Sequence, residues 1–343
     1  MMAAARSSKR AGWDDPCLAM RRLLALVCLL FACCAHAEDA PRAAPQLSFA
    51  TREQAQALLA ARDDFVSHLS AFDRAARVRR SAPVSEEEYL AFVTSQALAW
   101  TPEQRSLVEQ VYARLTPALD AIGVAWPEYV RVAVTTGAEE GGAPYTRGDA
   151  IVIPAPMLSS ARTLPRVLAH ELFHVLTRAN PALRERAYAA IGFRLCGDLA
   201  LPAALRELRI TNPDAVRNDA CIAVRVKGAT TWAVPVIYAR APYDAQAGQP
   251  FFAYLVAKLL LLDGSGAQPP SPATYDAVHP RLVDFDAVEG FFEQVGRNTQ
   301  YVIHPEEIVA DNFALLITGA ARPASPDVLD RIKAALPPPA VGR

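Results

Sequence analysis

The spacing of apolar residues divides the chain into a first part with helical periodicity and a later part that also contains strands. In residues 51–72, apolar side chains recur three or four positions apart, which predicts one helix. Two more helices are predicted to begin at capping sequences in residues 85–88 and 101–104. We therefore expect residues 49–127 to form an N-terminal helical region. An Ala/Pro-rich stretch over residues 38–48 is expected to precede it as a flexible leader.

Strand character begins after residue 128, where apolar and polar residues alternate. Strands are predicted at residues 129–135, 150–154, 222–226 and 231–238. Further helices are predicted at residues 164–179, 182–193, 286–295 and 305–317. This mixture predicts an α+β fold for residues 128–336, with a small mixed or antiparallel sheet packed on the helix of residues 164–179. The strand of residues 150–154 has two open interpretations, a sheet edge on which an extended peptide lies or an ordinary core strand.

The N-terminus predicts export from the cytosol. Two arginines at positions 21 and 22 precede an apolar run over residues 23–34, and Ala35-His36-Ala37 supplies small residues for cleavage. Residues 1–37 are therefore expected to be a signal peptide, with Met20 as an alternative start. The run is shorter than the about twenty residues that span a membrane, so we expect a periplasmic or secreted mature chain without a transmembrane segment. Lipoprotein anchoring at Cys33 is the less favoured alternative, because the preceding Phe31 is bulky for that cleavage site.

Composition limits the partners and the redox state of the chain. Hydrophobic residues make up 52% and charged residues 21% of 343 residues, which is typical of a globular protein. A net charge of −1 gives no electrostatic reason to expect a nucleic-acid partner, and we interpret the arginines of residues 74–80 as a solvated helix end. Of six cysteines, only Cys196 and Cys221 lie outside residues 1–37. In an exported protein a disulfide between them is the simplest expectation, and two buried free thiols are the alternative.

One stretch specifies a chemistry, His170-Glu171-Leu172-Phe173-His174. On a helix, His170 and His174 share one face and can bind a single Zn²⁺ ion. Glu171 can then act as a general base toward the water that the zinc activates. The alternative is a structural helix on which the two histidines merely pack.

A catalytic zinc site needs a third protein ligand. In the metzincin arrangement a glycine at position 177 and a histidine at position 180 complete the motif, but this chain has Thr177 and Asn180, which excludes it. Glu307 and Asp311 lie four residues apart on the predicted helix of residues 305–317, so they share one face.

We expect Glu307 to bind the zinc and Asp311 to accept the N–H of a ligating histidine. An unpaired carboxylate in so apolar a helix would be costly, which favours a ligand role. The competing candidates for the third ligand are Glu306, one residue earlier, and the distant Asp198.

The combination of H-E-x-x-H at residues 170–174 with E-x-x-x-D at residues 307–311 resembles the gluzincin group of zinc metallopeptidases. The resemblance covers these two short segments. It implies a zincin-like catalytic domain over residues 128–336 that hydrolyses peptide bonds in a peptide or protein substrate. Such enzymes often stabilise the oxyanion with a histidine, tyrosine or arginine, and Tyr301 and His304 are the candidates nearest to Glu307.

The sequence therefore predicts an exported zinc-dependent metallopeptidase with Glu171 as its general base. The alternative is a catalytically inactive or non-peptidase zinc-binding protein of the cell envelope. The presence of Glu171 argues against an inactive site, because an inactive relative could lose this residue without losing the metal.

Overall fold

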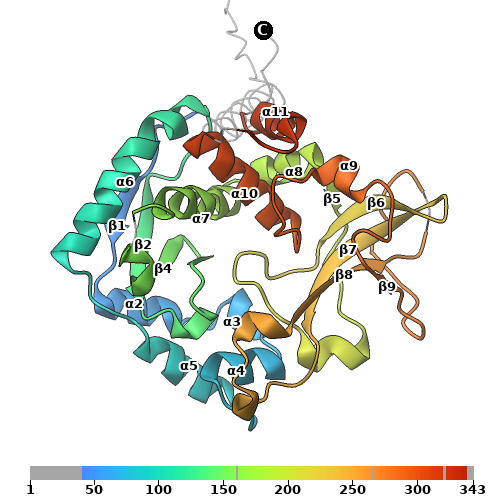
Figure 1. Cartoon of the computed structure of the whole chain (residues 1–343), viewed down its shortest axis with the longest axis horizontal. Helices are drawn as coiled ribbons and strands as arrows, with labels where there is room; N and C mark the ends of the chain where they lie inside the picture. The colour runs from blue at the N-terminus through green and yellow to red at the C-terminus, as the bar shows by residue number, and fades with distance from the viewer. Residues whose placement is uncertain (1–40, 160, 265, 320–321, 338–343) are drawn as a thin grey trace, which may run out of the picture. The chain divides into compact units, whose positions relative to one another are not determined.

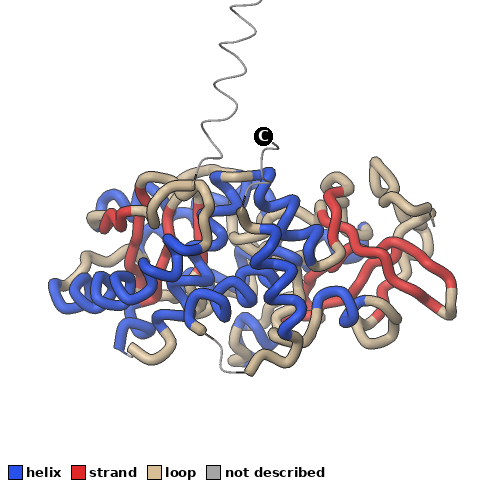
Figure 2. The backbone as a smooth tube through the Cα atoms, turned by 90° about the horizontal axis from the view of Figure 1, so that it is seen from above, coloured by secondary structure: helices blue, strands red, loops and turns tan. Residues whose placement is uncertain are grey.

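Two β-sheets lie on opposite sides of a group of packed helices (Figure 1). The computed structural model describes residues 41–159, 161–264, 266–319 and 322–337. The expected signal peptide, including Met20 and Cys33, and the first three residues of the expected leader lie outside the described residues. Residues from Pro41 onward belong to one compact unit. Seen at right angles, the strands form two separate groups with helices between them (Figure 2).

The first sheet is mixed and lies against the helix that carries the HExxH motif. Its strands, in spatial order, are β1 (Gln46–Phe49), β2 (Tyr129–Thr135), β4 (Ala150–Pro154) and β3 (Tyr145–Arg147). The neighbours β1–β2 and β2–β4 are parallel, and β4–β3 is antiparallel. Because β4 lies between β2 and β3, it is a core strand, and the two edge strands of the sheet are β1 and β3.

The prediction of a flexible leader over residues 38–48 is wrong for residues 46–48, because they belong to β1. This strand pairs with β2 in register from Gln46 opposite Tyr129. The preceding residues are also bonded, since the backbone N–H of Ala44 donates to Asp120 over 2.7 Å. An Ala/Pro-rich composition therefore did not reveal a strand whose pairing partner lies about eighty residues later in the chain.

The N-terminal helices are shorter and more numerous than predicted. They are α2 (Arg52–Leu59), α3 (Asp64–His68), α4 (Ala71–Val78), α5 (Glu86–Ser95) and α6 (Pro102–Ala121). The single helix expected over residues 51–72 is wrong because Asp63 and Ser70 each accept a backbone N–H and begin a new helix. The caps expected before α5 and α6 are confirmed as capping boxes at Ser85 and Thr101.

The helices around the HExxH motif share one apolar core with the first sheet. They are α7 (Leu164–Ala179), α8 (Pro181–Ala190), α9 (Phe291–Val295), α10 (Pro305–Thr318) and α11 (Pro326–Ala335). Helix α7 contacts α6, α8, α10 and the strands β3 and β4. Buried residues of these elements include Val132, Ile151, Leu172, Phe173 and Phe313. The helix expected over residues 286–295 is confined to α9, because Gly290 at φ 87° begins it.

The second sheet is antiparallel throughout and follows chain order. Its strands are β5 (Phe193–Leu195), β6 (Ala220–Val226), β7 (Ala229–Ala239), β8 (Leu255–Leu261) and β9 (Leu282–Val283). Lys227 and Gly228 both have positive φ, which is the geometry of a tight hairpin turn between β6 and β7. Cys196 and Cys221 form a disulfide with their Cα atoms 5.9 Å apart, as the sequence predicted.

One arginine expected to be solvated is instead among the most deeply buried side chains. Arg77 is only 1% exposed and lies between Asp73 and Glu140, with its Nη2 donating to Glu140 over 2.6 Å. We call Asp73, Arg77 and Glu140 the arginine cluster. A buried guanidinium is stable only when its donors are paired, so this residue joins α4 to the segment that follows β2.

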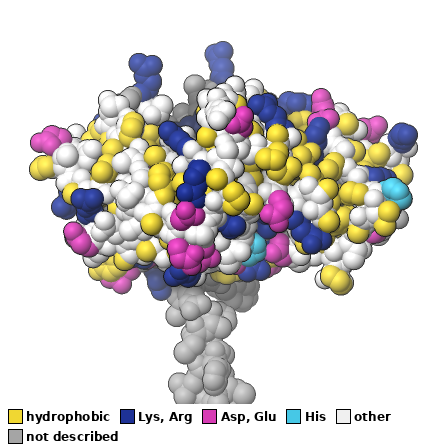
Figure 3. All heavy atoms as spheres, turned by 90° about the horizontal axis from the view of Figure 1, so that it is seen from below, with side chains coloured by type: hydrophobic (Ala, Val, Ile, Leu, Met, Phe, Trp, Pro, Cys, Tyr) yellow, Lys and Arg dark blue, Asp and Glu magenta, His cyan; other side chains and the backbone are white. Residues whose placement is uncertain are grey.

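The distribution of surface charge and the hydropathy of the helices give two further observations. On the face drawn in Figure 3, basic and acidic side chains lie among one another and do not form a single charged patch. None of the helices in the described residues is long and apolar enough to cross a membrane.

Candidate metal centre

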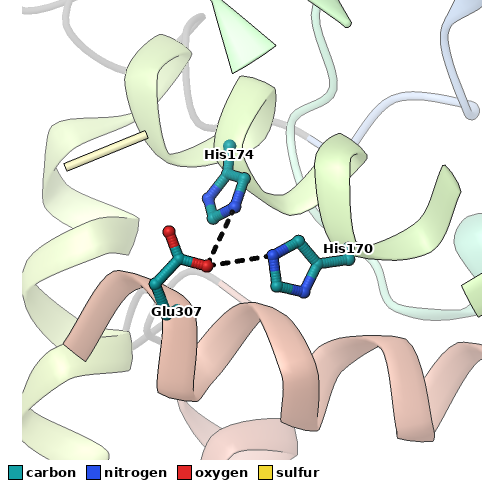
Figure 4. A group of neighbouring side chains, drawn as sticks. All are labelled: His170, His174 and Glu307. Carbon is teal, nitrogen blue, oxygen red and sulfur yellow. Dashed lines mark hydrogen bonds and ion pairs between the residues drawn. The ribbon is translucent and has the colours of Figure 1, made fainter. Parts of the chain in front are cut away.

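Helices α7 and α10 pack side by side and bring three potential metal ligands together. His170 and His174 lie one turn apart on α7, and Glu307 lies in the first turn of α10 (Figure 4). One ligand atom of each residue lies within 4.8 Å of the others. The described residues therefore contain a His/His/Glu group that could hold a metal ion. We call these three residues the metal centre.

The distances in the metal centre fit a small tetrahedral ion. Glu307 Oε2 lies 3.1 Å from His170 Nε2 and 3.7 Å from His174 Nε2. Two ligands each about 2.05 Å from a tetrahedral Zn²⁺ lie about 3.3 Å apart, and the two distances bracket that value. His174 Nε2 is buried without a hydrogen-bond partner, although such atoms are normally paired. A metal ion at this position would satisfy it.

Each histidine is held at its other nitrogen by a carboxylate. His170 Nδ1 lies 3.2 Å from Asp311 Oδ1, and His174 Nδ1 lies 2.9 Å from Glu306 Oε1. If each Nδ1 donates its proton to that carboxylate, each Nε2 keeps a lone pair for a metal. The structure thus brings Asp311 to the position that the sequence predicted, opposite one of the histidines.

Glu306 and Asp198, the two competing candidates for the third ligand, lie outside the metal centre. Glu306 bonds to His174 and also accepts hydrogen bonds from Thr177 at 2.5 Å and Tyr188 at 2.7 Å. Asp198 accepts the backbone N–H of Asn218 and belongs to no metal-binding group found in the described residues. Glu306 therefore orients His174. The sequence had instead suggested it as an alternative to Glu307 for the third metal ligand.

Electrostatics favour ionised carboxylates around the two histidines. Burial opposes ionisation of Glu307, but His174, His170 and the amide of Asn212 outweigh it and lower the pKa of Glu307 to about 2. Burial likewise opposes ionisation of Asp311, but hydrogen bonds from His170 and Thr299 lower its pKa to about 2. Positive charge beside these carboxylates, whether on an imidazolium or on a metal ion, favours their anionic forms.

Glu171 lies beside the metal centre in a different environment. Its side chain is 2% exposed, and Thr146 Oγ donates to its Oε2 over 2.8 Å. Burial raises the pKa of Glu171 to about 7, against the opposing effects of His170 and Thr146. A carboxyl group with a pKa near the working pH is suited to general acid–base chemistry.

A cleft of about 560 Å³ opens onto this group of residues. Such a volume is typical of sites for small molecules or short peptides. Its lining comprises Ala143, Pro144, Arg162, Thr163, Arg166, Val167, His170, Glu171, Asp214, Phe252, Tyr301, Glu307 and Asp311. His170 and Glu307 of the metal centre therefore share one solvent-accessible opening with Glu171, while His174 lies buried behind them.

The two candidate oxyanion donors have different positions. Tyr301 lines the cleft and is 40% exposed. His304 does not line it. His304 is 7% exposed, and its Nδ1 accepts the backbone N–H of Glu306 at the start of α10. His304 therefore caps α10 and does not lie in the cleft, where the sequence suggested that it could stabilise the oxyanion.

Four residues at the site carried no usable signal in the sequence. Thr146 contacts Glu171, Asn212 contacts Glu307 and Tyr188 contacts Glu306, in each case from a segment distant in the chain. Asp214 accepts the backbone N–H of Thr146. A second group of possible metal ligands, Glu171, His174 and Asp214, also lies within 4.8 Å and shares His174 with the metal centre. The cluster N-P-D at residues 212–214 reads as an ordinary turn, so only the fold reveals its contacts.

Comparisons of the chain with models of protein families, with curated proteins and with solved structures found no match.

Proposed function

We propose that this protein is an exported zinc-dependent metallopeptidase. The observation that carries the proposal is the convergence of two imidazole Nε2 atoms on one oxygen of Glu307, with the buried Glu171 beside them. Two histidines, a carboxylate and an open position toward a cleft are the donor set of a catalytic rather than a structural zinc site. This set also agrees with the gluzincin-like motifs.

The residues of the chain divide the work of hydrolysis. When bound, zinc supplies a Lewis acid that polarises the scissile carbonyl and lowers the pKa of its water to about 7. Because Thr146 occupies Oε2 of Glu171, the remaining oxygen, Oε1, is available to accept the proton of the attacking water. Glu171 then delivers this proton to the leaving amine. Tyr301, at the cleft, is the proposed hydrogen-bond donor to the developing oxyanion.

The proposed substrate is a peptide or protein segment that enters the cleft. The export signal over residues 1–37 would bring the mature enzyme to the periplasm or the exterior. The alternative, a zinc-binding envelope protein without peptidase activity, would share the metal centre. It would not require a buried glutamate whose pKa lies near 7 beside that centre.

A peptide-library digestion by the mature chain tests the proposal. Glu171→Gln removes the base with little change in size, so we expect stoichiometric zinc but a fall in kcat of about 10²–10⁴-fold. Glu185→Gln is the matched control, because Glu185 is an exposed glutamate on the neighbouring helix α8. We expect the control to keep both zinc and activity.

Other outcomes of this digestion contradict defined parts of the proposal. Undiminished hydrolysis by Glu171→Gln would rule out this residue as the base. Stoichiometric zinc without hydrolysis of any peptide would favour the non-peptidase alternative. A mature chain that binds no zinc would contradict both.

A further inference from the structure

We propose that residues 211–214 form a positioning segment that orients both the metal ligand Glu307 and the base Glu171. The segment lies between β5 and β6, far from both residues in the sequence. Asn212 holds Glu307 directly, and Asp214 holds Glu171 through Thr146. This inference rests on the proposed function. It adds Asn212 and Asp214 as positioning residues, which act on the reaction through Glu307 and Glu171.

Asn212 fixes which oxygen of Glu307 faces the histidines. Its Nδ2 donates to Glu307 Oε1 over 2.6 Å, which leaves Oε2 toward both imidazoles. Its own Oδ1 accepts the backbone N–H of Asp214 over 3.0 Å, so the network determines the orientation of the amide. Asn212 is only 8% exposed, and little water can replace its hydrogen bond. It therefore favours binding of a metal through a single oxygen of Glu307.

Asp214 acts on the base through the edge strand β3. Its Oδ1 accepts the backbone N–H of Thr146 over 2.8 Å, on the side of the strand that faces away from β4. The hydroxyl of Thr146 donates to Glu171 Oε2 over 2.8 Å. Asp214 thus accepts a backbone N–H of the edge strand β3 that β4 does not bond. This bond fixes the position of Thr146, whose hydroxyl orients Glu171.

The arginine cluster anchors the segment from the N-terminal helical region. Thr211 donates its backbone N–H to Asp73 over 3.1 Å and its hydroxyl to Asp73 Oδ2 over 2.7 Å. Arg77 Nη2 donates to the carbonyl of Thr211 over 2.9 Å. Because the side chains of Asp73 and Arg77 have no exposed surface, these bonds lie in a low-dielectric environment where breaking them is costly. Residues 41–127 thereby contribute to the site without entering it.

The segment has two arms, the contact of Asn212 with Glu307 and the chain of contacts from Asp214 through Thr146 to Glu171. They predict separable effects. Loss of the Asn212 amide should weaken metal binding, because outer partners of metal ligands typically contribute about 10–100-fold in affinity. Loss of the Thr146 hydroxyl should leave the metal in place and slow the reaction, because it touches only the base. If these residues had only a structural role, both changes would lower stability. Neither change would then specifically lower the metal affinity or the reaction rate.

The first experiment measures zinc affinity by competition with a chromophoric chelator. We expect Asn212→Leu, and independently the smaller Asn212→Ala, to lower the affinity about tenfold or more. Asn218→Leu is the matched control, since Asn218 is equally buried nearby but donates to the carbonyl of Leu199. Unchanged affinity in both Asn212 variants, or an equal fall in the control, would overturn the positioning role of Asn212.

The second experiment separates kcat from KM in peptide hydrolysis. We expect Thr146→Val to lower kcat about tenfold with zinc affinity and KM nearly unchanged, and Thr146→Ser to restore the rate. A Thr146→Val enzyme with full kcat would overturn the arm that runs through Asp214.

The failure of this inference differs from the failure of the proposed function. An unmodified chain that binds no zinc contradicts both. An unmodified chain that binds zinc and hydrolyses peptides, with variants that behave like it, contradicts only the positioning segment.

Discussion

Among the described residues, the arginine cluster and the metal centre are both buried groups of charged and polar side chains, and they differ in one respect. In the arginine cluster, every side-chain nitrogen and oxygen of Asp73, Arg77 and Glu140 has a hydrogen-bond partner. In the metal centre, His174 Nε2 has none, and two imidazoles converge on one carboxylate oxygen. Burial of charge is common to both. The unfilled coordination capacity distinguishes a site for a ligand from a structural ion pair.

The largest expected effect comes from breaking the metal centre itself. Glu307→Ala removes one of three protein ligands, so we expect zinc affinity to fall by more than about 10³-fold, to the level of two histidines alone. Competition titration with a chelator measures this. Asp198→Ala is the control for an acidic residue outside the centre, and its affinity should match that of the unmodified chain. Equal losses in the two variants would show that Glu307 is not a ligand.

Breaking the arginine cluster should have a different consequence. Arg77→Leu leaves Asp73 and Glu140 buried without a counter-charge, and we expect the free energy of unfolding to fall by about 3–5 kcal/mol. Arg131→Leu is the matched control, because Arg131 pairs with Asp149 at the surface, and its loss should cost less than about 1 kcal/mol. Chemical denaturation measures both. A small effect of Arg77→Leu would mean that the cluster does not anchor the fold.

Removal of zinc should affect stability only through the metal centre. Zinc at one hundred times its dissociation constant stabilises a single-site protein by about 2.7 kcal/mol. We therefore expect a chelator to lower the Tm of the unmodified chain by several degrees, and to leave the Tm of Glu307→Ala unchanged. Thermal unfolding with and without chelator tests this. An equal chelator effect in Glu307→Ala would place the stabilising metal elsewhere.

The smallest effect should come from the outer partners of the histidines. Glu306→Gln keeps the size of the side chain but weakens the bond to His174 Nδ1, so we expect about a tenfold loss of zinc affinity. Glu293→Gln provides an exchange of the same kind in the short helix α9, where Glu293 is bonded to the backbone of Gly290. Zinc affinity unchanged by Glu306→Gln would mean that His174 is oriented by packing alone.

The site was predictable from the sequence where its residues lie on one helix face. His170 with His174, and Glu307 with Asp311, are spaced four apart, and helical geometry alone places each pair together. The contacts of Glu306, Asn212 and Asp214 depend on how α7, α10 and residues 211–214 approach one another. No local pattern encodes that approach.

The same distinction explains the errors in the fold. The caps at Ser85 and Thr101 were predictable because each one is a local pattern of four residues. The strand β1 was missed because its pairing with β2 is distant in sequence. The solvated role expected of Arg77 was wrong because its partners, Glu140 and Thr211, lie on other elements.

X-ray absorption spectroscopy at the zinc edge of the zinc-loaded mature chain determines directly which atoms surround the metal. We expect one zinc per chain, with nitrogen and oxygen neighbours about 2.0–2.2 Å away and outer scattering from two imidazole rings. In His174→Ala the imidazole scattering should fall to that of one ring. Sulfur neighbours at about 2.3 Å, or two imidazoles that persist in His174→Ala, would contradict the proposed metal centre.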